Sequence, residues 1–110
     1  MRLFFSLSAA VLSLASASVQ ATEPELVAAS ELAKANGCFS CHSATEKIVG
    51  PAFVSVAEKY AGDKSAAAEL AQAIQMGSKG KWGRAAMPAH SSLSAQELKL
   101  LAHWVLATKP

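Results

Sequence analysis

The stretch Cys38-Phe39-Ser40-Cys41-His42 places two thiols three positions apart and an imidazole directly after the second thiol. This order is the attachment signature of a c-type haem. Each thiol adds to one of the two vinyl groups on one edge of the porphyrin, and the two intervening residues let both sulfurs reach that edge. The following residue then lies under the ring. We therefore interpret Cys38 and Cys41 as candidate covalent attachment sites and His42 as a candidate axial ligand of the iron.

Three other interpretations of this cysteine pair are weaker. A thioredoxin-like redox motif belongs to a fold of alternating strands and helices, and the sequence has almost no strand pattern. A zinc site needs two more Cys or His ligands at a matching spacing. The chain has no other cysteine, and its remaining histidines, His90 and His103, are thirteen positions apart. A disulfide within the motif would close too short a loop to stabilise the fold much.

The N-terminal segment has the pattern of a secretory signal. Met1-Arg2 is a short positive region, Leu3 to Leu14 is an apolar run, and Val19-Gln20-Ala21 places small or compact residues at the positions that a signal peptidase reads. We predict a signal peptide over residues 1–21, and cleavage after Ala17 is the alternative. The run is shorter than the ~20 residues of a membrane span, so we expect no stable membrane anchor.

Residues 22–110 are long enough for one small domain. A core of this size is marginal without a cofactor or a crosslink, and a buried haem would supply apolar bulk. Without Arg2, the chain has nine lysine and arginine residues and eight acidic residues. This near-neutral balance argues against nucleic acid as a partner, since a nucleic-acid surface is strongly basic. The charges are also scattered, so any docking patch must be local.

The mature chain has the pattern of an all-α domain with four helices. Pro24 suits the first turn of a helix, and Ser94 with Glu97 forms a capping box. Gly50-Pro51 marks a turn into a short helix with Pro51 in its first turn, where Phe53 and Tyr60 begin and end an apolar face. The expected helices are residues 24–36, about 51–60, 63 or 65 to 76, and 95–108.

A second axial ligand is expected from the distal half of the chain. Met87 is the best candidate, because Pro88 restrains the backbone beside it and a thioether raises the reduction potential relative to histidine. Met76 and His90 are the alternatives. We expect Met76 to lie in the core, because it ends a helix on an apolar face, and His103 to be structural.

The ordered set of motifs from Glu25 to Lys109 resembles small bacterial class I cytochromes c, most closely the cytochrome c-551 type. The resemblance implies a small class I cytochrome c fold, with about four helices wrapped around one covalently bound haem. Its terminal helices would cross near the attachment turn, and one haem edge would lie at the surface. The motifs that carry it are Gly37-Cys38-x-x-Cys41-His42, Gly50-Pro51-Ala52-Phe53, Gly77-Ser78-x-Gly80-x-Trp82-Gly83, Met87-Pro88 and Trp104-Val105-Leu106.

The resemblance also implies roles around the haem. The backbone carbonyl of Pro51 would accept the Nδ1–H of His42 and fix its orientation. Trp82 would donate its indole N–H to a haem propionate. Basic side chains would neutralise the propionates, with Arg84 and Lys47 ranked ahead of Lys79 and Lys81.

Two positions depart from the family pattern. Ala33 stands where the first helix often carries an aromatic residue. The alternatives are a less tightly packed crossing of the terminal helices, or compensation by Leu32 and Phe39. His90 stands where the family commonly has an asparagine that can hydrogen-bond the thioether.

The function implied by the resemblance is electron transfer by one haem c whose iron alternates between Fe(II) and Fe(III). Iron with two protein ligands does not readily bind a substrate, so we expect no enzyme activity; a haem peroxidase or a ligand sensor would need an open distal site. The implied compartment is the periplasm. We expect a monomer with transient partners, namely a cytochrome bc-type donor and a terminal acceptor such as a nitrite reductase, a cytochrome oxidase or a peroxidase.

Overall fold

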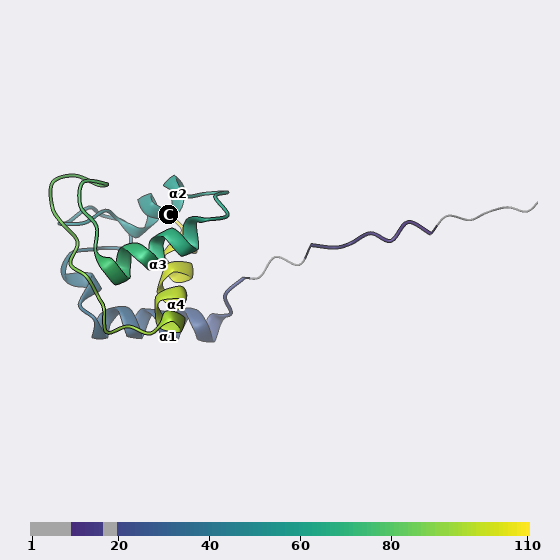
Figure 1. Ribbon diagram of the computed structural model, residues 1–110, viewed down its shortest axis with the longest axis horizontal. Coiled ribbons are helices and arrows are strands. Elements are labelled where there is room, and N and C mark those ends of the chain that lie inside the picture. Colours follow the sequence, from purple (N-terminus) through teal and green to yellow (C-terminus); the bar gives the residue numbers. More distant parts are fainter. Residues whose placement is uncertain (1–9, 17–19) are drawn as a thin grey trace, which may run out of the picture.

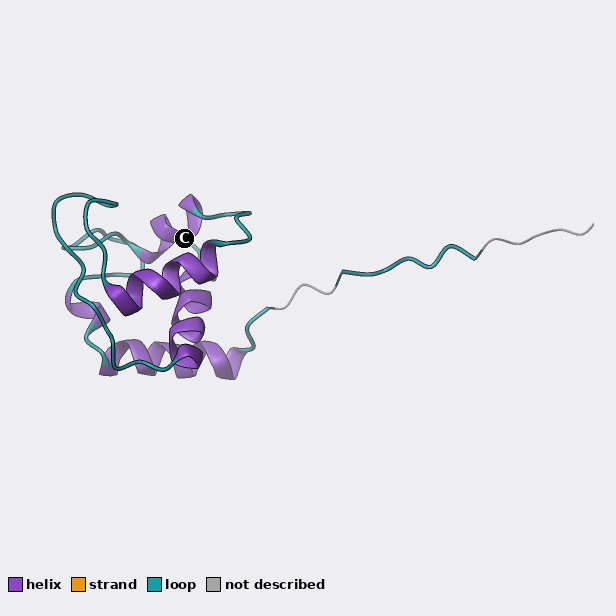
Figure 2. Ribbon diagram, viewed as in Figure 1, coloured by secondary structure: helices purple, strands orange, loops and turns teal. Residues whose placement is uncertain are grey.

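The computed structural model describes residues 10–16 and 20–110, and within them the regular structure is helical (Figure 2). No β-strand occurs in these residues. They contain two isolated β-bridges, one between His42 and Lys47 and one between Ser78 and Met87. The all-α prediction is therefore confirmed. The elements are α1 (Glu23–Ala35), the 3-10 turn η1 (Cys38–Ser40), α2 (Phe53–Lys59), α3 (Ala66–Met76) and α4 (Ala95–Leu106).

The helix ends differ from the expected ones where tertiary contacts compete with the helix. Pro51 was predicted in the first turn of α2, but the helix begins at Phe53 after the extended residue Ala52. The reason is that the Pro51 carbonyl points to His42 instead of starting the helix. In contrast, the capping box of α4 forms as predicted. The Glu97 N–H donates to the Ser94 hydroxyl at 3.1 Å, and the Ser94 N–H donates to the Glu97 carboxylate at 3.0 Å.

Helices α1 and α4 cross closely, as Figure 1 shows at the lower side of the domain. The crossing is rich in alanine: Ala29 and Ala33 of α1 and Ala102 of α4 have no exposed surface. Ala33 packs in one cluster with Leu98 and other leucines, and Leu32 lies against this cluster. Leu32 thus adds apolar contact beside Ala33, and Phe39 packs edgewise on Trp104 of α4 and on Phe53.

A second apolar cluster joins α2 to α4. Phe53, Val56 and Tyr60 of α2 are buried in it together with Val105 of α4. Cys38 lies half-buried against both this cluster and the α1–α4 cluster. The predicted attachment turn therefore sits where the two parts of the core meet.

The predicted signal peptide is only partly described. Residues 1–9 and 17–19 lie outside the described residues, and with them Ala17 and the first residue of the Val19-Gln20-Ala21 site. In residues 10–16 there is no helix, and Val11, Leu12 and Leu14 are 85–92% exposed. Among the residues described, the structure contains no helix that is both long and apolar enough to cross a membrane.

Candidate cofactor site

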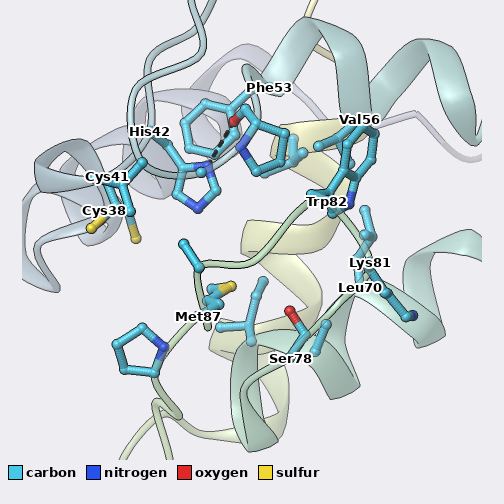
Figure 3. A pocket seen from close by; sticks show the side chains of 18 of the residues that line it. Cys38, Cys41, His42, Phe53, Val56, Leu70, Ser78, Lys81, Trp82 and Met87 are labelled. Carbon is cyan, nitrogen blue, oxygen red and sulfur yellow. Dashed lines mark hydrogen bonds between the residues drawn. The ribbon is translucent and has the colours of Figure 1, made fainter.

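A largely apolar cleft opens between the attachment turn and the loop that follows α3 (Figure 3). Its empty space is about 1120 Å³, including the part open to solvent. Apolar side chains make up most of its lining, which suits a ligand that is itself largely apolar. Helices α2, α3 and α4 line its interior with the apolar side chains of Phe53, Val56, Leu70, Ile74, Leu101 and Val105.

Cys38 and Cys41 line one side of this cleft as free, half-buried thiols. The η1 turn brings them together: the N–H groups of Cys41 and His42 both donate to the Cys38 carbonyl, at 3.2 and 3.0 Å. Burial raises the pKa of the Cys38 thiol, so that thiol is protonated at neutral pH. The two thiols are thus held side by side on one turn at the edge of an apolar space.

The His42 ring is held by three neighbours. Its Nδ1 lies 2.7 Å from the Pro51 carbonyl oxygen. Because a carbonyl can only accept, Nδ1 carries the hydrogen and Nε2 keeps its lone pair for a metal. The Phe53 ring stacks on the imidazole with centroids 5.0 Å apart. On a further side the ring approaches Gly50 so closely that a Cβ there would lie 2.5 Å from the ring carbon Cε1.

Met87 lies across the cleft from the His42 ring, as Figure 3 shows. Its backbone pairs with Ser78, with the Met87 N–H donating at 2.8 Å and the Ser78 N–H donating at 3.2 Å. Farther along, the His90 N–H donates to the Ile74 carbonyl at 2.9 Å. The Met87 segment is therefore tied to the C-terminal end of α3 at two points, through Ser78 at Met87 itself and through Ile74 three residues later.

The two alternatives to Met87 do not line the cleft. Met76 is 68% exposed, so the prediction of a core position is wrong. The cleft-facing side of α3 carries Leu70 and Ile74, and Met76 falls outside that face. The side chain of His90 is half-buried, and its Nδ1 has no hydrogen-bond partner among the described residues. Of the three candidate ligands, Met87 is the one whose side chain the structure places in the cleft.

Trp82 lines the cleft on the glycine-rich loop. The Lys59 ammonium lies 4.6 Å from the centre of its ring and 5.7 Å from the centre of the Tyr60 ring. Sequence reasoning missed Lys59, because a contact across 23 positions leaves no local pattern. These contacts hold the Trp82 indole against α2.

The basic residues near the cleft are placed differently from the ranking made on the sequence. Lys47 and Arg84 are exposed and do not line the cleft, whereas Lys81 does. The Lys81 ammonium lies 3.0 Å from the Glu69 carboxylate, and this hydrogen bond raises the pKa of Lys81. The structure thus gives no support to ranking Lys47 and Arg84 first.

Residues 26–109 match the family model described as Cytochrome c. The chain belongs to the cytochrome c family. It is 46% identical over 89 residues to cytochrome c-551 of Pseudomonas aeruginosa, covering 81% of this chain and 80% of that protein. It is 47% identical over 79 residues to cytochrome c-552 of Hydrogenobacter thermophilus, covering 72% of this chain and 80% of that protein. These relatives make it a small class I c-type cytochrome of the c-551 type.

Solved structures agree with the fold. The crystal structure of wild-type Nitrosomonas europaea cytochrome c552 superposes with a TM-score of 0.69 at 44% identity, covering 73% of this chain and 99% of that one. The class 1 cytochrome MtoD from Sideroxydans lithotrophicus ES-1 gives a TM-score of 0.64 at 29% identity, covering 80% of this chain and 98% of that one. The predicted class I cytochrome c fold is therefore confirmed.

The cleft fits the cofactor of this family. Two free thiols stand on one turn, His42 keeps a nitrogen for a metal, and apolar side chains line the interior. The chain thus carries one haem c, attached covalently through the Cys-x-x-Cys-His motif. Cytochromes of this type act in electron transfer, and the haem iron supplies that chemistry by changing between Fe(II) and Fe(III).

Proposed function

We propose that this cytochrome is a periplasmic single-haem electron carrier and not an enzyme. It takes one electron from a cytochrome bc-type donor and passes it to a terminal reductase or oxidase, such as a nitrite reductase. The observation that supports this proposal is the placement of an imidazole and a thioether on facing sides of one apolar cleft. When both side chains bind the iron, no open position remains for peroxide, oxygen or nitrite.

In this proposal His42 Nε2 and Met87 Sδ would hold the haem iron, and Cys38 and Cys41 would hold the haem through thioether bonds. The Pro51 carbonyl supports the assignment of His42, because its hydrogen bond to Nδ1 orients the ring and raises its basicity. A methionine opposite a histidine stabilises ferrous iron and raises the reduction potential. The carrier would thus have a higher potential than a protein with two histidine ligands.

Trp82 has a separate role in the proposal, in which its indole N–H donates to a haem propionate. The position of Trp82 in the wall of the cleft supports this role. The Lys59 cation over the Trp82 ring also supports this role, because a cation on the ring face holds the indole in place. Lys81, which also lines the cleft, brings a positive charge to the same loop.

Export is part of the proposal. Residues 1–21 would be a secretory signal that is removed after Ala21, with Ala17 as the alternative, and residues 22–110 would be the mature domain. The exposure of Val11, Leu12 and Leu14 supports this division, because these side chains add nothing to the core. The family match begins at residue 26, after the proposed cleavage site.

The rim of the cleft is the proposed docking surface for redox partners, and the protein would work as a monomer. Ile48 and Val49 are 54% and 52% exposed beside the attachment side, and the small residues Ala85 and Ala86 are exposed on the opposite loop. Lys79 is exposed on that same loop. A small apolar surface edged by charge suits the weak, short-lived encounters of an electron carrier.

The proposal is tested on the exported holoprotein by mixing it anaerobically with a cytochrome bc complex and, separately, with a nitrite reductase. We expect rapid one-electron reduction and oxidation, with rates that fall as salt is added. Fresh protein should bind neither carbon monoxide nor cyanide readily. Rapid binding of either ligand, or sustained turnover of peroxide by the untreated protein, would contradict the role of a carrier.

A further inference from the structure

The segment that carries Met87 lies directly against the residues that end α3. Gly77 ends that helix with φ 78° and ψ 172°, a backbone conformation that glycine adopts almost alone. The next residue, Ser78, forms the two backbone hydrogen bonds to Met87. Gly77 is thus the residue at which the chain leaves α3 and begins to pair with the Met87 segment.

At Gly77 the two segments are too close for any side chain. A Cβ at this position would lie 2.6 Å from the Met87 carbonyl oxygen, 3.1 Å from the Ala89 nitrogen and 3.3 Å from the Pro88 carbonyl carbon. All three are backbone atoms, so no side-chain rotation can relieve the contact. Gly62 offers a comparison at nearly the same φ, 77°, where a Cβ would meet no described atom within 4 Å.

We infer that Gly77 is a positioning residue for Met87. The missing side chain lets the backbone of Met87, Pro88 and Ala89 lie against the end of α3, and this approach sets how far the Met87 sulfur reaches into the cleft. The inference rests on the proposed function, in which that sulfur bonds the haem iron.

The Met87 segment cannot absorb a new side chain by a local adjustment. It is held at Met87 by the Ser78 pair and three residues later by the His90 N–H, which donates to the Ile74 carbonyl. A Cβ at position 77 must therefore move the whole segment away from α3. Metal–ligand distances tolerate changes of only ~0.2 Å, so a shift of the backbone weakens or breaks the sulfur–iron bond.

The test compares Gly77→Ala with Gly62→Ala as holoproteins. Both variants carry the strain of an alanine at positive φ, and both should melt at a lower temperature. We expect only Gly77→Ala to lose the weak far-red band of sulfur-to-iron charge transfer, measured per haem. It should also have a lower reduction potential and bind cyanide faster than Gly62→Ala. Hydrogen exchange at the Met87 amide should speed up in Gly77→Ala alone.

The result that overturns the inference is a Gly77→Ala protein whose band, potential and Met87 exchange match those of Gly62→Ala. Met87→Ala is measured in parallel to separate this failure from a failure of the ligand assignment. If Met87→Ala keeps the band, the ligand assignment is wrong and the inference falls with it. If Met87→Ala loses the band while Gly77→Ala keeps it, only the role of Gly77 is wrong.

A second variant keeps the inference testable if Gly77→Ala accumulates too poorly to be measured. Pro88→Gly loosens the Met87 segment, so Gly77→Ala combined with Pro88→Gly can fold around the new Cβ. We expect the double variant to show a weaker far-red band per haem than Pro88→Gly alone. Equal bands in these two proteins would contradict the inference.

Discussion

The two walls of the cleft are built in different ways. The wall that carries His42 is one continuous stretch, from Cys38 to Phe53, and its main contacts join residues close in the sequence. The wall that carries Met87 is a loop after α3, and its contacts reach back to Ile74 and Ser78 or across to Lys59. The first wall is set by local geometry, whereas the second depends on the packing of the rest of the molecule.

This difference separates the residues that attach the haem from the residues that tune its reduction potential. The thiol pair and the imidazole are positioned mainly by hydrogen bonds and ring stacking within residues 38–53, so substitutions in other helices should disturb them less. The methionine wall is positioned by contacts between distant segments, so substitutions remote from the iron can alter ligand strength there. Variants of the first wall should therefore change haem content and stability, and variants of the second should change the spectrum and the potential.

The largest effect should come from removing both thiols of the first wall. Cys38→Ala with Cys41→Ala should yield no covalent haem, and the domain should lose its stable fold because Cys38 lies where both core clusters meet. Intact mass and circular dichroism measure these losses. Ser40→Ala, an exposed position between the two cysteines, is the control and should keep one haem. Haem that acid acetone extracts from the unaltered protein would refute covalent attachment.

The aromatic support of the first wall should give the next largest effect. Phe53 is buried and stacks on His42. Phe53→Ala should lower the free energy of unfolding by ~3–5 kcal/mol, the usual cost of removing a buried phenylalanine. Phe39→Ala should cost less, because that ring is 39% exposed and only packs edgewise on Phe53 and Trp104. Denaturant titration of the holoproteins measures both; equal losses would show that the first wall does not depend on Phe53.

Charge reversal on the second wall should change partner binding more than haem chemistry. Lys79→Glu should slow association with redox partners by a factor on the order of ten or less at low salt, and the difference should shrink as salt is added. Lys99→Glu, exposed on α4 and outside the cleft lining, is the matched control. Stopped-flow kinetics measure the rates. A shifted potential with an unchanged rate would instead make Lys79 a propionate partner.

The smallest effect should come from the ion pair between Lys81 and Glu69 on the second wall. The pair is exposed, and Glu69→Gln should lower stability by less than ~1 kcal/mol at neutral pH. The pair raises the pKa of Lys81, so its contribution is present below the ordinary lysine pKa and is lost as pH rises through the raised one. The melting temperatures of the two proteins should therefore differ up to the ordinary lysine pKa of ~10.4 and converge only as the pH rises beyond it. A difference that grows with pH would contradict this account of the pair.

The sequence predicted the first wall more fully than the second. The Cys-x-x-Cys-His motif and Gly50-Pro51 lie within fourteen positions, and the resemblance to the family supplied the Pro51 contact that the structure contains. On the second wall, the sequence indicated Met87-Pro88 as the candidate ligand segment. The predicted core position of Met76 was wrong, because its place on the helix face depends on how α3 packs. Neither the Lys59 contact with Trp82 nor the close approach at Gly77 could be seen, since both join segments that the sequence does not relate.

The helices were predicted more closely than their ends. The capping box at Ser94 fixed the start of α4, because its hydrogen bonds join neighbouring residues. The start of α2 was missed by two residues, because the Pro51 carbonyl is drawn to His42 by the tertiary fold. Local chemistry thus predicts a helix boundary only where no distant group competes for the same backbone atoms.

The central claim is that the two walls supply the two axial ligands of one iron, and Met87→Ala tests it most directly. The ferric protein should show a weak far-red band from sulfur-to-iron charge transfer, and the variant should lose it. The variant should also have a lower reduction potential, because the thioether favours ferrous iron, and should bind cyanide and carbon monoxide. Met76→Ala is the control and should keep the band at little cost in stability, because Met76 is largely exposed. A Met87→Ala protein that keeps the band and the potential would contradict the account.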